Sequence, residues 1–289
     1  MFAPFPGLRF RSSRPASNGA ISYTSRNGPI ELDHLRTLAP SVFAEQAHGS
    51  RSGKYAYIPT SAVLEELMKE GFRPFAVMQG GSRDEAKRGF TKHQIRLRHD
   101  SAAMEVGGTH HEIVLLNSHD GTSTYRLMAG AYRLACSNGL VIAERIIDDI
   151  RIPHKGDVTG QVIDGCISIL DRLPEVSDSI RRMESLQLTE REQAAFGRAA
   201  LALRYEEDAP FESSKLLAAR RQADAGNSMW QTFNRVQENM IRGGVSYVQQ
   251  DQNGHRSRRS TREIKGIDQN NQLNRALWLL AEEMQKLKS

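Results

Sequence analysis

The chain has 289 residues, a hydrophobic fraction of 39% and a formal net charge of +5. This size allows one large domain or two modest ones, and the positive charge is compatible with a nucleic-acid partner. No run of about 18 apolar residues occurs and the first residues hold no apolar signal core, so we expect a cytoplasmic protein without a membrane span.

Residues 1–50 are predicted to form an irregular N-terminal arm, because the prolines, serines and arginines at its start follow no period. A helix is predicted to open at Thr60 and to end at Gly71. Three strands should follow, over residues 72–78, 90–98 and 111–117, joined by short turns. Short turns between consecutive strands predict antiparallel pairing.

Residues 125–142, YRLMAGAYRLACSNGLVI, are predicted to form an amphipathic helix that stops at a polar turn. Leu127, Ala131 and their apolar neighbours recur at helical spacing, and Asn138 with the following glycine suits a left-handed C-terminal turn. Residues 51–152 therefore predict an α+β core, in which helices flank an antiparallel three-stranded sheet.

Residues 153–289 are predicted to form a mainly helical region. One helix should lie near Val162, one should begin at the Thr189 capping box, one should be capped by Asn227, and the last should span 267–287. Residues 249–262 are predicted to form a polar basic loop.

Two groups of basic residues are candidate nucleic-acid contacts. In the second strand Arg96 and Arg98 alternate with Ile95 and Leu97, which predicts a one-sided basic face that can follow a phosphate backbone. A solvated sheet face is the alternative interpretation.

The second group is the basic loop after His255, where arginines cluster in one short stretch. Planar guanidinium groups suit phosphate contacts, whereas a solubilising surface loop is the alternative. The complete set of candidate contacts is Arg88, Lys92, Arg96, Arg98, Arg126, Arg133, Arg256, Arg258, Arg259 and Arg262.

The residue patterns of common catalytic and metal sites are absent from the sequence. Adjacent His110 and His111 point to opposite faces of a strand, and neither a nucleophile elbow nor a phosphate loop occurs. We therefore expect no metal, no cofactor and no enzymatic activity. Cys136 and Cys166 are predicted to be reduced, buried thiols, although one disulfide between them is possible.

Three segments resemble a known protein family: Tyr132–Leu140 (YRLACSNGL), Trp230–Asn239 (WQTFNRVQEN) and Asn274–Trp278 (NRALW). They are similar to the signatures of a phage- and plasmid-borne family, the domain of unknown function 932. The resemblance covers roughly residues 55–286. It implies a mobile genetic element as the setting and implies no particular activity.

A more remote resemblance is to the single-strand annealing proteins of eukaryotic and phage recombination, which share the order helix, three-stranded hairpin sheet, helix. Arg133 and the Ser137–Gly139 stop would fall in and after the last of these helices, with Tyr132 in place of the first member of the expected Lys-Arg pair. The resemblance implies a protein that anneals or protects single-stranded DNA and assembles as a ring or filament.

The sequence thus favours a non-enzymatic single-stranded DNA-binding protein that forms homo-oligomers. The alternative is a protein-binding regulator that antagonises a host defence or stress-response factor. A flat helical C-terminal half with basic loops would serve that function equally well.

Overall fold

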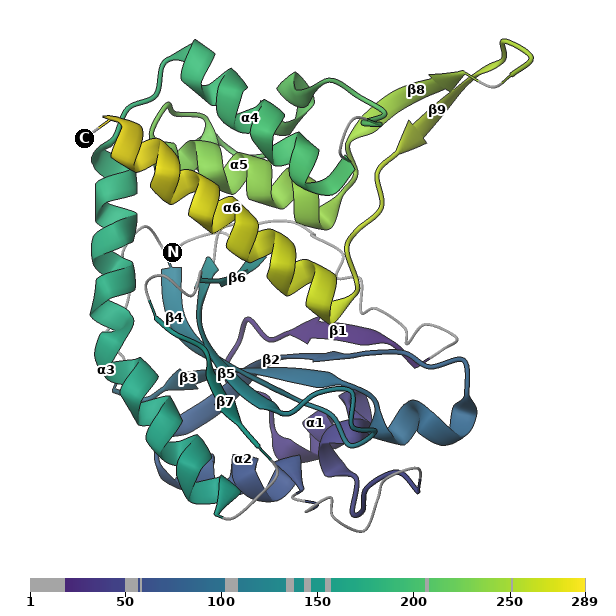
Figure 1. Ribbon diagram of the computed structural model, residues 1–289, viewed down its shortest axis with the longest axis vertical. Helices are drawn as coiled ribbons and strands as arrows, with labels where there is room; N and C mark the ends of the chain where they lie inside the picture. Colours follow the sequence, from purple (N-terminus) through teal and green to yellow (C-terminus); the bar gives the residue numbers. More distant parts are fainter. Residues whose placement is uncertain are drawn as a thin grey trace, which may run out of the picture.

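The computed structural model describes the chain in the following segments: residues 19–49, 57, 59–101, 109–133, 138–142, 147–153, 157–205, 208–250 and 252–288. Within them a twisted antiparallel sheet lies below a layer of helices, and a two-stranded arm projects from that layer (Figure 1).

The main sheet has the strand order β1-β2-β3-β4-β5-β6, and β7 also pairs with β5. Every pairing in it is antiparallel. Its strands are β1 (Ile21–Thr24), β2 (Phe72–Gln79), β3 (His93–His99), β4 (Thr109–Asn117), β5 (Tyr125–Arg133), β6 (Asn138–Val141) and β7 (Ile150–Ile152).

The predicted three-stranded sheet is wrong. The three expected strands are present as β2, β3 and β4, but β1 extends the sheet at one edge and β5, β6 and β7 extend it at the other.

The largest error concerns residues 125–133, which form strand β5 instead of a helix. In β5, Leu127 and Ala129 face one side of the sheet while Met128 faces the other, and all three are buried. A strand buried on both faces has no polar alternation, so its period is easily mistaken for that of a helix.

One face of the sheet packs against helices α1 (Leu32–Leu38), α2 (Thr60–Lys69) and α3 (Val158–Ser185), together with the short 3-10 turn η1 (Pro40–Phe43). Ile95, Leu97 and Ile113 point into this core. Apolar side chains on α2 and α3 fill the same cluster, and burying each of them stabilises the fold by about 1.5–3 kcal/mol.

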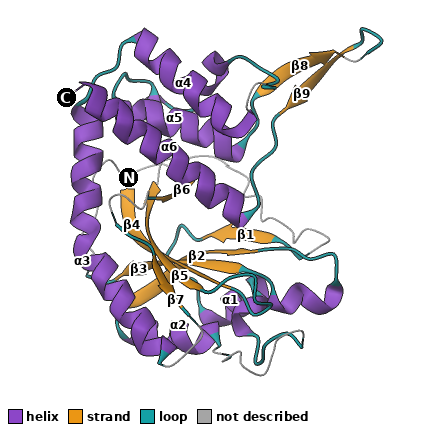
Figure 2. Ribbon diagram, in the orientation of Figure 1, coloured by secondary structure: helices purple, strands orange, loops and turns teal. Residues whose placement is uncertain are grey.

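The opposite face of the sheet carries a smaller apolar cluster of Val114, Leu116, Met128, Val141 and Ile267. Ile267 opens the last helix, α6 (Ile267–Lys288), which crosses the sheet diagonally (Figures 1 and 2). The start of α6 is held by a hydrogen bond of 2.7 Å from Asn271 to Gln94 on β3. Helices therefore cover parts of both sheet faces.

Helices α4 (Glu190–Tyr205) and α5 (Met229–Arg242) pack with α6 to form the helical layer. The predicted capping box at the start of α4 is confirmed, since Thr189 and Glu192 exchange hydrogen bonds. The predicted cap of α5 is off by one residue: Ser228, rather than Asn227, accepts from the backbone N–H of Gln231. Short 3-10 turns η3 (Ser213–Leu217) and η4 (Gln222–Asp224) connect α4 to α5, and η2 (Glu85–Phe90) connects β2 to β3.

The segment predicted as a basic loop is a β-hairpin made of β8 (Ser246–Gln250) and β9 (Arg256–Ser260). We call it the arm. It extends beyond the helices at the upper right of Figure 1. Because its strand residues are exposed apart from the half-buried Tyr247, its sequence shows no apolar alternation from which strands could be predicted.

Part of the predicted irregular N-terminal segment is regular, since β1 and α1 lie within residues 19–49. Residues 1–18 lie outside the described residues. The proposed boundary at residue 152 stays a prediction, and one continuous apolar cluster contains residues from both sides of it, such as Val63 and Trp278. No helix within the described segments is both long enough and apolar enough to cross a membrane.

Gly243 sets the direction in which the arm leaves α5. Its φ of 65° and ψ of −148° belong to a region essentially restricted to glycine, and an added Cβ would lie 2.6 Å from the backbone carbonyl carbon of Arg262. We expect Gly243→Ala to lower the free energy of unfolding by about 1–3 kcal/mol, as measured by urea denaturation.

Gly244→Ala is the matched control for that substitution. Gly244 also has a positive φ, of 78°, but an added Cβ there would meet only a flexible arginine tip 3.7 Å away. A loss in Gly244→Ala as large as that in Gly243→Ala would show that backbone strain alone, and not the close approach to Arg262, determines the effect.

Candidate nucleic-acid interface

Arg96 and Arg98 were predicted to form an exposed basic face, but Arg96 is buried and Arg98 is partly buried in an ionic cluster on β3. Arg96 is 6% exposed; its Nε donates to Glu112 and its Nη2 donates to the carbonyl of Ala131 at 2.9 Å. Arg98 donates to the other oxygen of Glu112 at 3.0 Å. Its guanidinium also lies 4.1 Å from the centre of the Phe75 ring. The prediction of an exposed strand face is therefore wrong, because Glu112 on the neighbouring strand supplies the balancing charge.

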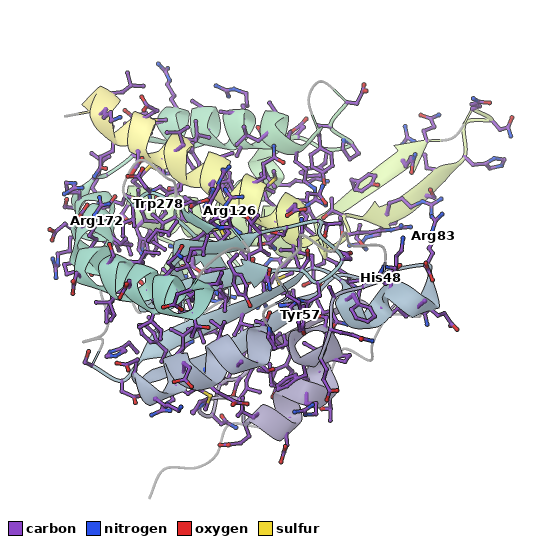
Figure 3. The ribbon with its side chains drawn as sticks, turned by 60° about the horizontal axis from the view of Figure 1, so that its bottom comes forward. His48, Tyr57, Arg83, Arg126, Arg172 and Trp278 are labelled. Carbon is purple, nitrogen blue, oxygen red and sulfur yellow. The ribbon has the colours of Figure 1, made fainter. Side chains whose placement is uncertain are left out.

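Arg126 is also part of an ion-pair network. Asp149 accepts from Arg126 at 2.5 Å and from Arg275 of helix α6, and the Asp149 side chain is only 4% exposed. Figure 3 shows Arg126 beside α6, the helix that also carries Trp278. These contacts join β5 to the helical layer, so Arg126 has a structural partner where a phosphate contact was predicted.

Arg133, at the end of β5, is 5% exposed and lies 2.7 Å from Asp224 in the turn before α5. Arg221 connects Asp224 to Glu238 of α5, at 3.0 Å and 2.6 Å. This chain of charges ties the sheet to α5. Buried charges of this kind require partners, and removing one partner is costly.

Arg88 and Lys92 are closer to solvent and each has a partner. Arg88 pairs with Glu85 at 2.9 Å, and Lys92 pairs with Asp268 of α6 at 2.6 Å. Glu85 and Asp268 are highly exposed, so each pair adds little stability. The six predicted contacts outside the arm are therefore spread over several local ion pairs and do not form one continuous surface.

The arm presents the remaining predicted contacts to solvent. Every residue of β9 is exposed, including Arg256, Arg258 and Arg259, and Arg262 is exposed just beyond it. Within the described part of the chain, no carboxylate forms an ion pair with any of these four arginines. A concentration of unneutralised guanidinium groups attracts phosphate or another polyanion.

The base of the arm is anchored by residues that the sequence did not single out. Lys215 donates to the Ser246 carbonyl at 2.8 Å, and Arg204 donates to the Arg262 carbonyl at 2.9 Å. Tyr247 lies against Phe211, with ring centroids 6.2 Å apart. These contacts come from distant positions in the chain, so no local pattern could have revealed them.

A second cluster of polar groups is fully buried at one end of β3 and β4, around Thr60 at the start of α2. His93 and His119 place their Nε2 atoms 2.9 Å and 3.2 Å from the Thr60 hydroxyl, and Asn117 donates to it at 2.9 Å. Tyr57 lies beside His119, with ring centroids 5.0 Å apart; His48 donates its backbone N–H to the carbonyl of His119 (Figure 3).

Burial is the main reason that the pKa of His93 is lowered to about 3, with the nearby His119 acting in the same direction. His93 Nδ1 lies 3.2 Å from the carbonyl of Thr91, which suits an Nδ1–H donor and leaves Nε2 as the acceptor of the Thr60 hydroxyl. The cluster is a buried hydrogen-bonded network that joins α2 to the sheet.

A cavity of about 270 Å³ lies next to Arg133, between α3 and the start of α5. The side chains that line it are Arg133, Glu184, Gln187, Ala223, Ser228, Trp230 and Gln231. In the capping box of α5, the side chains of Ser228 and Gln231 each accept a hydrogen bond from the other residue's backbone N–H.

Among the described residues no group of three or more His, Cys, Asp or Glu could hold a metal ion. Cys166 is buried, which raises its thiol pKa, and Cys136 lies outside the described residues.

The family model described as "Domain of unknown function (DUF932)" matches residues 47–278. The chain belongs to the DUF932 family. It is 43% identical over 265 residues to the UPF0380 proteins YafZ and YfjQ of Escherichia coli strain K12, across 91% of this chain and 94% of each relative. No solved structure matches the chain.

The DUF932 assignment confirms the resemblance seen in the sequence, and the structure shows where its segments lie. Trp230–Asn239 lies in α5 and Asn274–Trp278 lies in α6. Within them Gln237 donates to Asn274 at 2.8 Å, and Asn239 donates to the carbonyl of Leu216 at 2.9 Å. Gln237, Asn239 and Asn274 of these two DUF932 segments are buried and help to hold the helical layer together.

The remote resemblance to annealing proteins stays a prediction. It relied on a helix after the three-stranded sheet, and strand β5 occupies residues 125–133 instead. The side chains of residues 134–140, which include the whole of the proposed polar stop, lie outside what the structure describes.

Proposed function

We propose that this DUF932 protein binds nucleic acid and that the arm supplies the principal phosphate contacts. The observation that carries the proposal is the exposure of Arg256, Arg258 and Arg259 on one projecting hairpin, without carboxylate partners in the described part of the chain. Arginine remains charged at all physiological pH values and donates in a fixed fork that matches phosphate oxygens.

The same charges account for the way in which binding would work. Guanidinium groups on the arm displace condensed counterions from the phosphate backbone, so affinity should fall steeply as salt rises. Such binding requires no bond cleavage and no nucleotide. Annealing or protection of single-stranded DNA, with assembly into a ring or filament, is the activity predicted from the sequence; the present proposal is nucleic-acid binding through the arm, for either strand type.

The first experiment removes three arginines from the arm. We expect Arg256→Ala, Arg258→Ala and Arg259→Ala together to weaken binding of both single-stranded and duplex DNA, measured by fluorescence anisotropy across a salt series. The slope of log affinity against log salt should decrease, by roughly one unit for each phosphate contact that is lost. Folding should be unaffected, because exposed arginines contribute little to stability.

A charge-matched control replaces Arg182, Arg191 and Arg198 by alanine. These three arginines are exposed on α3 and α4, so the control loses the same net charge at another place. Equal losses in both triple variants would mean that general charge, and not the arm, drives binding. Absence of DNA binding by the unmodified protein at low salt would overturn the proposal and favour the protein-binding regulator.

A further inference from the structure

The register of the arm sorts its side chains onto two faces of different composition. Arg256 is opposite Gln250 and Arg258 is opposite Val248, and these four side chains share one face because alternate residues of a strand point the same way. We call this the outer face. Arg259 is opposite Tyr247 on the other face.

The orientation of the arm follows from its anchor. Tyr247 packs against Phe211, which in turn lies 5.6 Å from the ring of Tyr205 at the end of α4. The Tyr247 face is therefore directed toward the helical layer at the base, and the outer face points away from it. Val248 is 63% exposed and gives the outer face one apolar side chain.

The outer face carries the chemical groups that read base edges in a DNA major groove. Arginine donates to guanine O6 and N7, glutamine pairs with adenine N6 and N7, and apolar groups contact the thymine methyl. The groove is about 12 Å wide and admits a two-stranded β-ribbon. Two strands about 4.8 Å apart, with their side chains, are of that width.

Single strands require a different surface. Proteins that bind them stack successive bases on aromatic side chains, which line a groove with basic residues. Tyr247 and His255 are the rings among the described arm residues, and Tyr247 is already engaged with Phe211. The arm is a projecting ribbon, so it is suited to enter a groove of the nucleic acid. A protein that binds a single strand has to provide the groove itself.

We infer that the nucleic acid bound by the arm is double-helical DNA, and that the arm enters the major groove with its outer face against the base edges. This inference rests on the proposed function and specifies its target. Double-stranded RNA is excluded as the preferred target because its major groove is deep and too narrow for side chains to read.

The test compares five probes of one sequence, chosen from a random duplex library by its affinity for the full chain. They are the single strand, the DNA duplex, the RNA duplex, a DNA duplex with glucosylated 5-hydroxymethylcytosine, and the DNA duplex saturated with netropsin. Glucose fills the major groove, whereas netropsin occupies the minor groove. We expect the plain DNA duplex to bind about tenfold or more tightly than the single strand and the glucosylated duplex, with little effect of netropsin.

Arg258→Ala and Arg259→Ala provide a matched pair of variants, since they remove the same charge from adjacent residues on opposite faces. Arg258→Ala should weaken duplex binding about tenfold, and Arg259→Ala by less than about threefold. Tight binding of the glucosylated duplex, preference for the single strand, or equal losses in the two variants would overturn the inference while DNA binding by the arm stands. Failure to bind any probe would overturn the proposed function as well.

Discussion

Replacing Glu112 by alanine is expected to lower the free energy of unfolding by about 3–5 kcal/mol. Glu112 is 1% exposed and its carboxylate accepts from both Arg96 and Arg98. Without it, two guanidinium groups remain in a poorly hydrated environment with no compensating charge on the strand beside them. Urea denaturation followed by circular dichroism measures the change.

Two controls separate the loss of charge balance from other effects. Glu66→Ala removes a carboxylate from an exposed pair with Lys69 on α2 and should cost less than about 1 kcal/mol. Replacing Glu112, Arg96 and Arg98 together by methionine should cost less than Glu112→Ala alone, because no charge remains buried. A small change in Glu112→Ala would indicate that water reaches both arginines.

Stability should decrease as the pH falls from 7 to 5, with His93 as a major cause. The pKa of His93 is about 3 in the folded protein and near 6.5 in the unfolded chain. Its contribution is therefore complete above the unfolded pKa and declines below it, because the unfolded chain takes up a proton that the folded protein excludes. His93 alone should lower the free energy of unfolding by about 2 kcal/mol between pH 7 and pH 5.

His93→Gln isolates this contribution, since glutamine cannot titrate in that range. The drop in stability between pH 7 and pH 5 should be about 2 kcal/mol smaller in His93→Gln than in the unmodified protein. His34→Gln, at an exposed histidine of α1, serves as the control and should retain the full dependence. Identical pH dependence in all three proteins would show that His93 does not remain neutral in the folded state.

Local patterns in the sequence predicted the elements that have one buried face or a specific cap. Helix α6 begins at Ile267 as expected, and the capping box at Thr189 opens α4. Strands β2, β3 and β4 were predicted from runs of alternating or apolar residues between turns. In each case the residues that determine the element are neighbours in the chain, so the information is local.

Only the tertiary structure decided what β5, the arm and the buried arginines are. β5 is a strand because sheet and helices cover both of its sides, and the arm is regular although its strand residues are exposed apart from the half-buried Tyr247. Arg96 and Arg133 look like surface cations until Glu112 and Asp224 are brought beside them. The arm arginines are distinguished by having no such partner in the described part of the chain. A charge's role depends on which opposite charges lie within a few ångströms, and only the folded chain sets those distances.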